Sequence, residues 1–387
     1  MSFYKHLTIF IVLGLFNCHS MANPTIEPTI LPNANPSNET RLESQINVAQ
    51  VEGKSSQTQI ASNTPSRKTS KKGKTKSERF GDRRDVQIWI WDMHVKNNFS
   101  AQELKTLFRT ISHDQKVIEA ISKPFEEVPW NKYRERFVND ARAKAGVQFW
   151  NANEAALKKA QAEYGVPPEV IVAIIGVETN YGQNRGNFLV LQALATLAFD
   201  YPPRSPFFKK ELEQFLLLTR EEKLDPRSIY GSYAGAMGLP QFMPSSYREF
   251  AVDFTGNGKR DLINNTDDAI GSVANYFKMH GWIPNEPVAY LAQGYGSEFE
   301  RLATTNQKDP KPKLSLGELA KFNIVPKDKN ALKNKDRLAA FIMLPTDDKP
   351  ELWLALQNFY AITRYNHSVN YAMAVHQLSQ RIRELHG

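Results

Sequence analysis

The chain has 387 residues, of which 41% are hydrophobic and 23% charged, and its formal net charge is +8. This length suits one large domain or two ordinary ones. The positive charge is uneven, because residues 23–84 hold 11 Lys and Arg against 6 Asp and Glu, which leaves residues 85–387 almost neutral. A nearly neutral body argues against a nucleic-acid groove in the folded part, and the single cysteine excludes an intrachain disulfide.

The first 22 residues have the parts of a secretory signal peptide. Lys5 precedes an apolar run over 7–16, and Ser20 and Ala22 form a small-residue pattern before cleavage at Asn23. The apolar run is too short to span a bilayer as a mature helix. We therefore predict that residues 1–22 are removed and that the protein is exported to the periplasm.

A second processing route remains open at Cys18. The four residues that end at Cys18, Leu-Phe-Asn-Cys, resemble a lipoprotein box, in which that cysteine becomes the lipid anchor. Phe16 and Asn17 suit such a box poorly. Attachment to the outer membrane through Cys18 is therefore the less favoured alternative.

Residues 23–84 are rich in Pro, Asn, Ser, Thr and Gln and end in a basic run. They contain too little apolar surface to form a core, so we predict a disordered basic tether. Its basic end could contact a membrane surface or other cell-wall proteins, although a solvated linker is the favoured interpretation.

The remaining chain, from residue 85, is predicted to be mainly α, with no internal repeat. Apolar periodicity and capping residues predict helices over 101–122, 131–164, 167–179, 187–199, 206–222, 266–280 and 368–386. Strand signals are few. The best lie near the C-terminus, over 338–344 and 362–365.

The predicted helix over 167–179 is apolar on every face. Two prolines suit its first turn, and Asn180 and Gly182 are residues that commonly end a helix. Because residues 170–177 are all small or apolar, we expect this helix to be buried all round. Glu178 follows directly, on the helical face of Ile171, Ile174 and Ile175.

Burial and the negative end of the helix dipole would both raise the pKa of Glu178. A carboxylic acid that stays protonated near neutral pH is what general acid catalysis at a glycosidic oxygen needs. The alternative from the residue pattern alone is a structural carboxylate that reaches water or pairs with an arginine.

Three further stretches could carry chemistry. Residues 232–244 contain small residues and glycines that allow close backbone approach to a ligand, with Gln241 and Phe242 supplying an amide and a ring. A tight helix–helix contact explains this stretch equally well. Residues 364–371 alternate aromatic and amide side chains, for which a helix-capping turn is the alternative.

Residues 253–261 resemble an EF-hand calcium loop. Oxygen-bearing side chains occupy the first, third, fifth and ninth positions, and Gly258 stands sixth at the sharp turn. The twelfth position is Asn264 rather than Glu, so we expect weak calcium binding or none. The candidate ligands are Asp253, Thr255, Asn257, Lys259, Asp261 and Asp267. Histidine pairs at metal-ligand spacing, a GxSxG elbow and a phosphate loop are absent from the sequence.

Taken together, these motifs resemble the lytic murein transglycosylase B family. Gly-Val-Glu-Thr-Asn-Tyr-Gly around Glu178 is followed by Gly-Ala-Met-Gly-Leu-Pro-Gln-Phe-Met-Pro-Ser and then by the Arg-Tyr-Asn segment. The likeness covers about residues 85–387. It implies a lysozyme-like α domain with additional α and small α/β subdomains. Its core would span about 165–285, and a C-terminal part, 286–387, would return to the cleft.

The resemblance also implies an activity. Such enzymes cleave the β-1,4 bond between N-acetylmuramic acid and N-acetylglucosamine in peptidoglycan without water or a required cofactor. By resemblance, Glu178 protonates the leaving oxygen and then acts as base while the muramyl 6-hydroxyl closes a 1,6-anhydro ring. The residues expected to bind substrate are Tyr133, Arg204, Ser232, Gln241, Phe242, Tyr365, Asn366 and Tyr371.

This sequence departs from the family pattern at two places. Pro203 replaces the first of an arginine pair, and Thr255 and Asn257 replace more acidic residues in the calcium loop.

Two other functions stay open. A muramidase hydrolase would need a second carboxylate, for which Asp200 and Asp225 are remote candidates. A non-catalytic peptidoglycan-binding scaffold would not require a costly buried acid.

Overall fold

A computed structural model describes residues 79–123, 128–295, 299–303 and 309–387. The predicted signal peptide, Cys18 and residues 23–78 of the predicted tether lie outside the described residues, so those expectations stay predictions. Residues 79–84, the predicted end of the tether, are instead ordered, because Phe80 is buried in the core. None of the described helices combines the length and apolar character needed to cross a bilayer.

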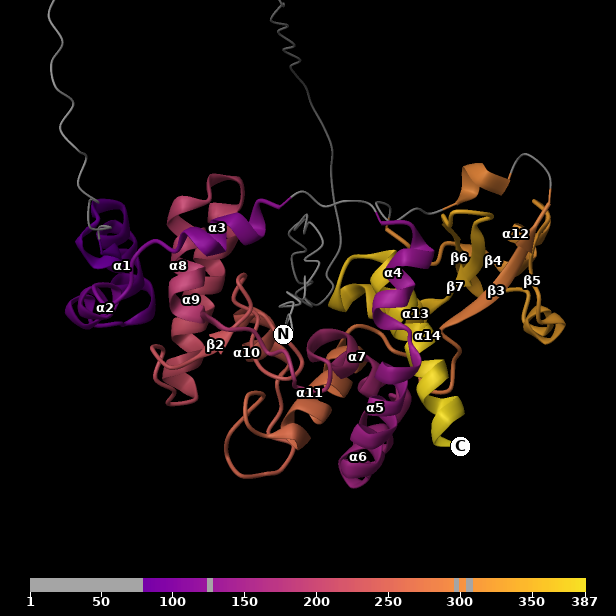
Figure 1. Ribbon diagram of the computed structural model, residues 1–387, viewed down its shortest axis with the longest axis horizontal. Coiled ribbons are helices and arrows are strands. Elements are labelled where there is room, and N and C mark those ends of the chain that lie inside the picture. Colours follow the sequence, from indigo (N-terminus) through magenta and orange to yellow (C-terminus); the bar gives the residue numbers. More distant parts are fainter. Residues whose placement is uncertain (1–78, 124–127, 296–298, 304–308) are drawn as a thin grey trace, which may run out of the picture. The chain divides into compact units, whose positions relative to one another are not determined.

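The described chain is mainly helical, which confirms the predicted fold class (Figure 1). The first seven helices are α1 (Arg84–Asn97), α2 (Ala101–Phe108), α3 (Gln115–Ile121), α4 (Trp130–Phe137), α5 (Asp140–Ala152), α6 (Glu154–Tyr164) and α7 (Pro168–Thr179). The others are α8 (Val190–Asp200), α9 (Ser205–Glu221), α10 (Pro244–Phe250), α11 (Thr266–Met279), α12 (Leu316–Ala320), α13 (Gln357–Tyr365) and α14 (Val369–His386).

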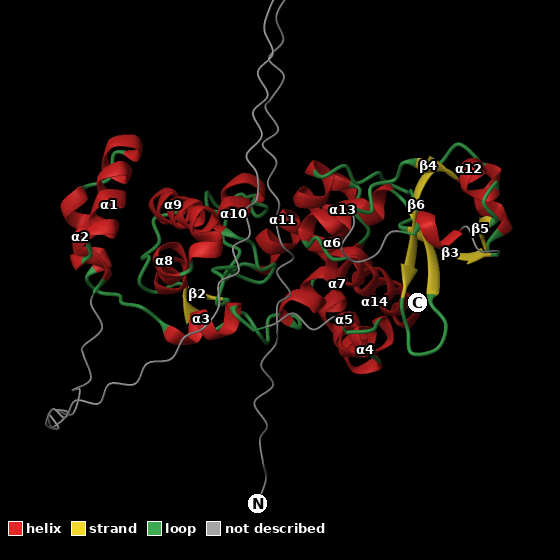
Figure 2. Cartoon of the chain, turned by 90° about the horizontal axis from the view of Figure 1, so that it is seen from above, coloured by secondary structure: helices red, strands yellow, loops and turns green. Residues whose placement is uncertain are grey.

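Two antiparallel sheets complete the described elements. The smaller one pairs β1 (Phe188–Leu189) with β2 (Tyr230–Gly231). The larger has the strand order β4-β6-β7-β3-β5 (Figure 2), with β3 (Ala289–Gly294), β4 (Leu314–Ser315), β5 (Ile324–Pro326), β6 (Leu338–Leu344) and β7 (Glu351–Ala355). Strand β6 has the predicted bounds. The sequence did not predict the other strands, because they are short and apolar and polar residues alternate only weakly along them.

Two predicted helices are interrupted in the structure. The segment over 101–122 forms α2 and α3, because the Asp114 carboxylate accepts the backbone N–H of Lys116 and begins a new helix. The segment over 131–164 forms α4, α5 and α6, and the Asn139 side chain begins α5 by accepting the N–H of Arg142. Capping side chains therefore divide stretches whose apolar periodicity continues.

The strand predicted over 362–365 is wrong, because these residues belong to α13. Its buried residues include Phe359 and Ile362, which lie three positions apart on one face of a helix. Asn358 is also buried and fixes α13 to the chain after α11. It accepts the N–H of Ile283 at 2.7 Å and donates to the carbonyls of Ile283 and Glu286.

Helix α7 is buried along its length, as predicted. Every residue in it except Glu169 is buried, and α5, α6, α11 and α14 pack against it. It begins with Pro168 and ends at Asn180, whose φ of 49° is left-handed. The helix therefore carries Glu178 into the interior at its last turn.

A tyrosine hydroxyl packs between α5 and α7. The Tyr181 hydroxyl donates to the carbonyl of Arg142 at 2.9 Å, and both Gly146 and Gly176 approach it closely. A Cβ added at Gly176 would lie 2.5 Å from that oxygen. The absence of a side chain at these two glycines thus allows the end of α7 to be fixed against α5.

We predict that Gly176→Ala lowers the free energy of unfolding by about 1–3 kcal/mol, because the added methyl group overlaps the Tyr181 hydroxyl. Urea denaturation would measure the loss. Gly317→Ala in α12 is the matched control, since a Cβ there meets nothing nearer than 3.4 Å. Equal stability of the two variants would contradict this packing argument.

Candidate active site

The Glu178 carboxyl is buried at the last turn of α7, with 6% of the residue exposed. Tyr371, in the first turn of α14, donates its hydroxyl hydrogen to Glu178 Oε1 at 2.5 Å. Burial raises the pKa of Glu178 to about 7, and the bond from Tyr371 opposes that rise because it stabilises the carboxylate. The group can therefore exist in both protonation states near neutral pH.

Three tyrosines from three elements lie around this carboxyl. Tyr133 comes from α4, Tyr365 ends α13 and Tyr371 begins α14. Burial raises the pKa of each phenol, and the charge of Glu178 raises each further. All three consequently stay protonated at neutral pH and can act as hydrogen-bond donors.

The segment 232–244 folds back on itself beside α7. Met237 forms backbone bridges with both Gly231 and Phe242, and this tight path requires positive φ at Gly238 (74°) and Gln241 (50°). Thr179 Oγ1 donates to the carbonyl of Leu239 at 2.9 Å. The neighbour of Glu178 in the sequence thereby fixes this segment to the end of α7.

Gln241 presents a buried acceptor oxygen. Its Nε2 donates to the carbonyls of Arg185 and Gly238 at 3.1 and 2.9 Å, while its Oε1 has no hydrogen-bond partner among the described residues. A buried acceptor of this kind usually has a partner, so a ligand donor is the natural one. By contrast, Ser232 Oγ accepts the N–H of Ala236 at 3.0 Å and closes its own turn.

Phe242 joins this segment to the tyrosines. Its ring centroid lies 5.7 Å from that of Tyr365 and 5.5 Å from that of Tyr276. The Tyr365 hydroxyl donates to the carbonyl of Pro240 at 2.6 Å, and Asn366 is buried next to it in the sequence. The segment 232–244 and the residues after α13 therefore meet beside Glu178.

The structure thus brings Glu178, Tyr133, Tyr365 and Tyr371 together, with Gln241 and Phe242 linked to them. Arg204 is the residue that precedes α9. Its guanidinium carbon lies 4.5 and 5.1 Å from the ring centroids of Phe207 and Phe208. Its charge also acts on Tyr233, which belongs to the segment 232–244.

Sequence reasoning did not single out Tyr276 of α11. Its ring stacks on His280 with 3.9 Å between centroids, and its hydroxyl donates to the carbonyl of Arg364 at 2.6 Å. It also contacts Phe242 and Tyr365. Tyr276 and His280 lie four residues apart on one face of a helix, and this spacing is the sequence signal that could have identified Tyr276.

In the candidate calcium loop, acidic side chains accept hydrogen bonds from the loop's own backbone N–H groups. Asp253 accepts the N–H groups of Gly256, Asn257 and Gly258 at 2.7–3.0 Å. Asp268, which was not among the predicted ligands, is fully buried and accepts three N–H or O–H groups from Phe254 and Thr255 and a fourth from Asp261. No group of three or more His, Cys, Asp or Glu suited to a metal ion occurs in the described part of the chain.

The two remote candidates for a second catalytic carboxylate are held in ion pairs. Asp200 contacts Arg83 at 2.6 Å and His113 at 2.7 Å, and Asp225 contacts Arg227 at 2.9 Å. Within the described ranges, no acidic residue contributes to the pKa shift of Glu178. Three phenols surround Glu178, and neither Asp200 nor Asp225 acts on its pKa.

Comparison with known proteins relates this arrangement to one family. Residues 81–380 match the transglycosylase SLT domain family. Membrane-bound lytic murein transglycosylase B of Escherichia coli (strain K12) is 42% identical over 313 residues, which cover 78% of this chain and 84% of that protein.

Solved structures are similar over most of their length. Soluble lytic transglycosylase SltB1 from Pseudomonas aeruginosa is 46% identical with a TM-score of 0.73, over 78% of this chain and 99% of that one. Escherichia coli Slt35 in complex with calcium is 42% identical with a TM-score of 0.71, over 79% and 95%. Pseudomonas aeruginosa SltB3 in complex with NAG-NAM-pentapeptide is 31% identical with a TM-score of 0.68, over 77% and 79%.

We predict that Glu178→Gln increases stability, and that the gain grows with pH. Because the folded-state pKa of about 7 lies above the ordinary value of about 4.3, ionisation favours the unfolded chain. Wild-type stability contributed by the neutral acid is therefore present below about pH 4.3 and is lost as pH rises through about 7, by at most about 4 kcal/mol.

Urea denaturation of both proteins at about pH 4 and about pH 8 measures this difference. The amide is a neutral isostere of the protonated acid, so the two proteins should be close in stability at the lower pH. A stability difference that is the same at both pH values would contradict the raised pKa.

Proposed function

Since this chain belongs to the lytic murein transglycosylase B family and is an enzyme that acts on peptidoglycan, we propose that Glu178 is its catalytic acid and base. The bond cleaved is the β-1,4 linkage between N-acetylmuramic acid and N-acetylglucosamine. The observation that carries this assignment is the buried carboxyl whose pKa is raised to about 7. An acid with that pKa can give up a proton and take one back at neutral pH.

The reaction uses the Glu178 carboxyl twice, first as acid and then as base. Protonated Glu178 donates to the glycosidic oxygen, the bond from that oxygen to C1 of the muramyl residue breaks, and N-acetylglucosamine leaves with its hydroxyl restored. The resulting carboxylate then removes the proton of the muramyl 6-hydroxyl as its oxygen bonds to C1. The product is a 1,6-anhydro ring, Glu178 is protonated again, and no water is consumed.

Tyr371 positions the acid. Its hydroxyl holds Oε1 of Glu178, which leaves Oε2 for proton transfer to the substrate. The same bond limits the rise in the pKa of Glu178, so the group is not held permanently neutral. Tyr133 and Tyr365 maintain the low-dielectric surroundings that favour the protonated form.

Two observations favour this reaction over simple hydrolysis and over a scaffold role. Asp200 and Asp225, the candidates for activating a water molecule, are already engaged in ion pairs. A scaffold would gain nothing from a buried acid, whose ionisation destabilises the folded protein. Cyclisation by a hydroxyl of the substrate needs only one protein carboxyl.

The glycan strand of peptidoglycan is the partner that this site suits. Gln241 Oε1 offers a buried acceptor to a sugar hydroxyl or amide, and Phe242, Tyr365 and Asn366 line the same region. Ser232 belongs to the same segment, and Arg204 is assigned to the peptide stem. The SltB3 complex with NAG-NAM-pentapeptide supports a ligand of this class. A periplasmic location follows from such a substrate.

Digestion of purified peptidoglycan by the chain from residue 23 onward, followed by mass spectrometry, tests the reaction. We expect products with 1,6-anhydromuramic ends, and we expect Glu178→Gln to produce none, because the amide cannot transfer a proton. Products with free reducing ends would mean hydrolysis. Anhydro products from the variant at the wild-type rate would remove Glu178 from the mechanism.

We infer that calcium binds weakly in the loop at 253–267 and takes no part in the reaction. The Slt35 complex supports such a site, and positive φ at Gly256 and Gly258 gives the tight turn that a calcium loop needs. The fit is partial. Asp253 and Asp261 supply carboxylates and Thr255, Asn257 and the Lys259 carbonyl supply neutral oxygens, with Asp267 at the start of α11.

We predict a calcium dissociation constant on the order of 10⁻⁴–10⁻³ M by calorimetry, because few anionic ligands are available and Lys259 adds positive charge. Asp253→Asn with Asp261→Asn should remove the binding, whereas Asp225→Asn, which changes an exposed ion pair with Arg227 outside the loop, should preserve it. Peptidoglycan cleavage should survive chelation by EDTA. Tight binding, or loss of cleavage on chelation, would contradict this prediction.

A further inference from the structure

Exposed lysines are concentrated in one segment of the part of the chain that contains the larger sheet. Residues 311–335 hold seven Lys against two acidic residues, Glu318 and Asp328, which gives a net charge of +5. The rest of 85–387 holds 30 Lys and Arg against 33 Asp and Glu, so it is slightly negative. All seven side chains are exposed, and together we call them the lysine surface: Lys311, Lys313, Lys321, Lys327, Lys329, Lys333 and Lys335.

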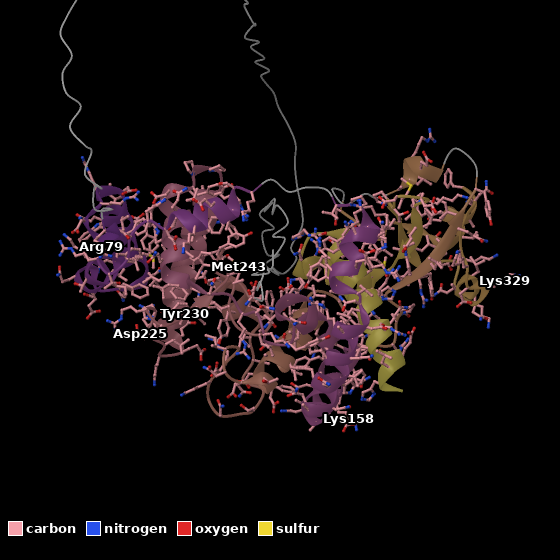
Figure 3. The ribbon with its side chains drawn as sticks, viewed as in Figure 1. Arg79, Lys158, Asp225, Tyr230, Met243 and Lys329 are labelled. Carbon is pink, nitrogen blue, oxygen red and sulfur yellow. The ribbon has the colours of Figure 1, made fainter. Side chains whose placement is uncertain are left out.

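Backbone contacts gather these lysines around the short helix α12. The N–H of Gly317, in the first turn of α12, donates to the carbonyl of Lys335 at 2.9 Å, and Lys321 caps the other end of the same helix. Five helical residues rise only about 8 Å, so these two lysines lie near opposite ends of one short helix. The 3-10 helix η4 (Lys329–Lys333), whose first residue is labelled in Figure 3, packs on β5, and α12 packs on β5 as well. The lysines are therefore neighbours in space as well as in sequence.

Salt bridges do not neutralise the lysine surface. Glu318 and Asp328 each accept a backbone N–H group at the start of a helix, Glu318 within a capping box. The salt bridge nearest in sequence uses an arginine, because Arg337 contacts Glu286 at 2.6 Å. None of the seven lysines forms a salt bridge with an acidic side chain of the described residues. Their charges are thus available to a partner from outside the chain.

Protection of the sheet edges explains only part of this charge. The strands β4 and β5 are the two outer strands of the larger sheet, and lysines beside an edge strand discourage pairing with another chain. Lys313 and Lys327 directly flank these strands. The other five lysines lie in η4, at the end of α12 or in loops, where no strand edge needs protection.

We propose that the lysine surface binds the carboxylates of the stem peptides of peptidoglycan, at places on the polymer other than the cleaved bond. This inference rests on the peptidoglycan substrate but not on the role of Glu178. A lysine ammonium is a flexible point charge, which suits many loosely placed carboxylates, whereas a single fixed carboxylate favours the planar fork of arginine. A second contact with the same polymer raises the effective concentration of glycan at the active site.

An anionic bilayer is the other partner with matching charge, and the composition favours it less. Binding at a membrane interface combines positive charge with apolar side chains that enter the headgroup region. Within 311–335, Phe322, at 40% exposed, is the only large hydrophobic residue that is exposed. Positive charge without an apolar face suits a hydrated polymer that carries carboxylates.

Co-sedimentation with purified peptidoglycan sacculi tests the proposal. Glu178→Gln, in the chain from residue 23, is the starting protein, so that cleavage does not alter the sacculi during the measurement. Adding Lys321→Gln, Lys329→Gln and Lys333→Gln together should weaken binding about tenfold at low salt, because three exposed charge contacts are lost. The difference should shrink as salt is raised. Residues 23–78 are the same in every variant, so their charge does not enter the comparison.

Lys116→Gln, Lys144→Gln and Lys349→Gln together are the matched control. These lysines are exposed on α3, on α5 and in the loop between β6 and β7, and none forms a salt bridge within the described ranges. The control loses the same net charge and should bind as tightly as the starting protein. Equal weakening in both triple variants would mean that net charge alone governs binding, which would overturn the proposal. So would unchanged binding by the variant of the lysine surface.

Sacculi whose carboxyl groups have been converted to amides identify the ligand. The starting protein and the variant of the lysine surface should bind these amidated sacculi equally, because the carboxylates are gone. A remaining difference would exclude carboxylates as the ligand. Vesicles of phosphatidylcholine and phosphatidylglycerol test the other partner. A variant that lost vesicle binding while it kept sacculus binding would overturn the proposal in favour of a bilayer.

Cleavage rates separate this surface from the active site. With Glu178 restored, the variant of the lysine surface should cleave sacculi more slowly but short soluble fragments at the wild-type rate, because a short fragment gains nothing from a second contact. Equal slowing on both substrates would contradict a separate binding surface. Failure of this proposal leaves the anhydro products and the effect of Glu178→Gln unchanged, so it is distinct from failure of the proposed reaction.

Discussion

The structure depends on one unfavourable placement, a carboxyl group buried at the end of an apolar helix. Burial alone favours the neutral form of Glu178, and its only hydrogen bond within the described residues comes from the Tyr371 hydroxyl. The packing that buries α7 is what maintains this state. Four helices cover α7, and close packing at Gly146 and Gly176 holds the Tyr181 hydroxyl against its end. The same packing that stabilises the core therefore sets the protonation of the acid.

The groups around the carboxyl come from distant parts of the chain. Tyr133 precedes Glu178 by three helices, whereas Tyr365 and Tyr371 follow it by almost two hundred residues. The segment 232–244 lies between them, fixed by Thr179 on one side and by Tyr365 on the other. Helix α14 thus returns to α7, with α13 packed against α14, and the two helices bring Tyr371 and Tyr365 to a site that α7 alone would leave open. One protein carboxyl is enough for the chemistry because the attacking hydroxyl belongs to the substrate.

Much of this could be predicted from sequence where local signals and burial agree. Helix α7 has prolines at its start, a left-handed residue at its end and only apolar residues between, so its bounds and the raised pKa of Glu178 were both predictable. The breaks at Asp114 and Asn139 were missed because a capping side chain inside a periodic stretch is recognised only when its bond is seen. The site shell could not be derived locally, since Tyr133 and Tyr371 become neighbours only through tertiary packing. Resemblance to a family supplied those residues. It did not indicate that Gln241 has an unpaired oxygen or that Asp268 is fully buried.

The protonation of Glu178 is the central claim, and it can be measured directly. Selective carboxyl ¹³C labelling of glutamate, with Glu178→Gln to assign the resonance, would give the titration of this one group in the folded protein. The account predicts a midpoint near pH 7, and a higher one in Tyr371→Phe, because the bond from Tyr371 stabilises the carboxylate. A midpoint near the ordinary glutamate value of about 4.3 would contradict it, since the acid would then be ionised and unable to protonate the leaving oxygen.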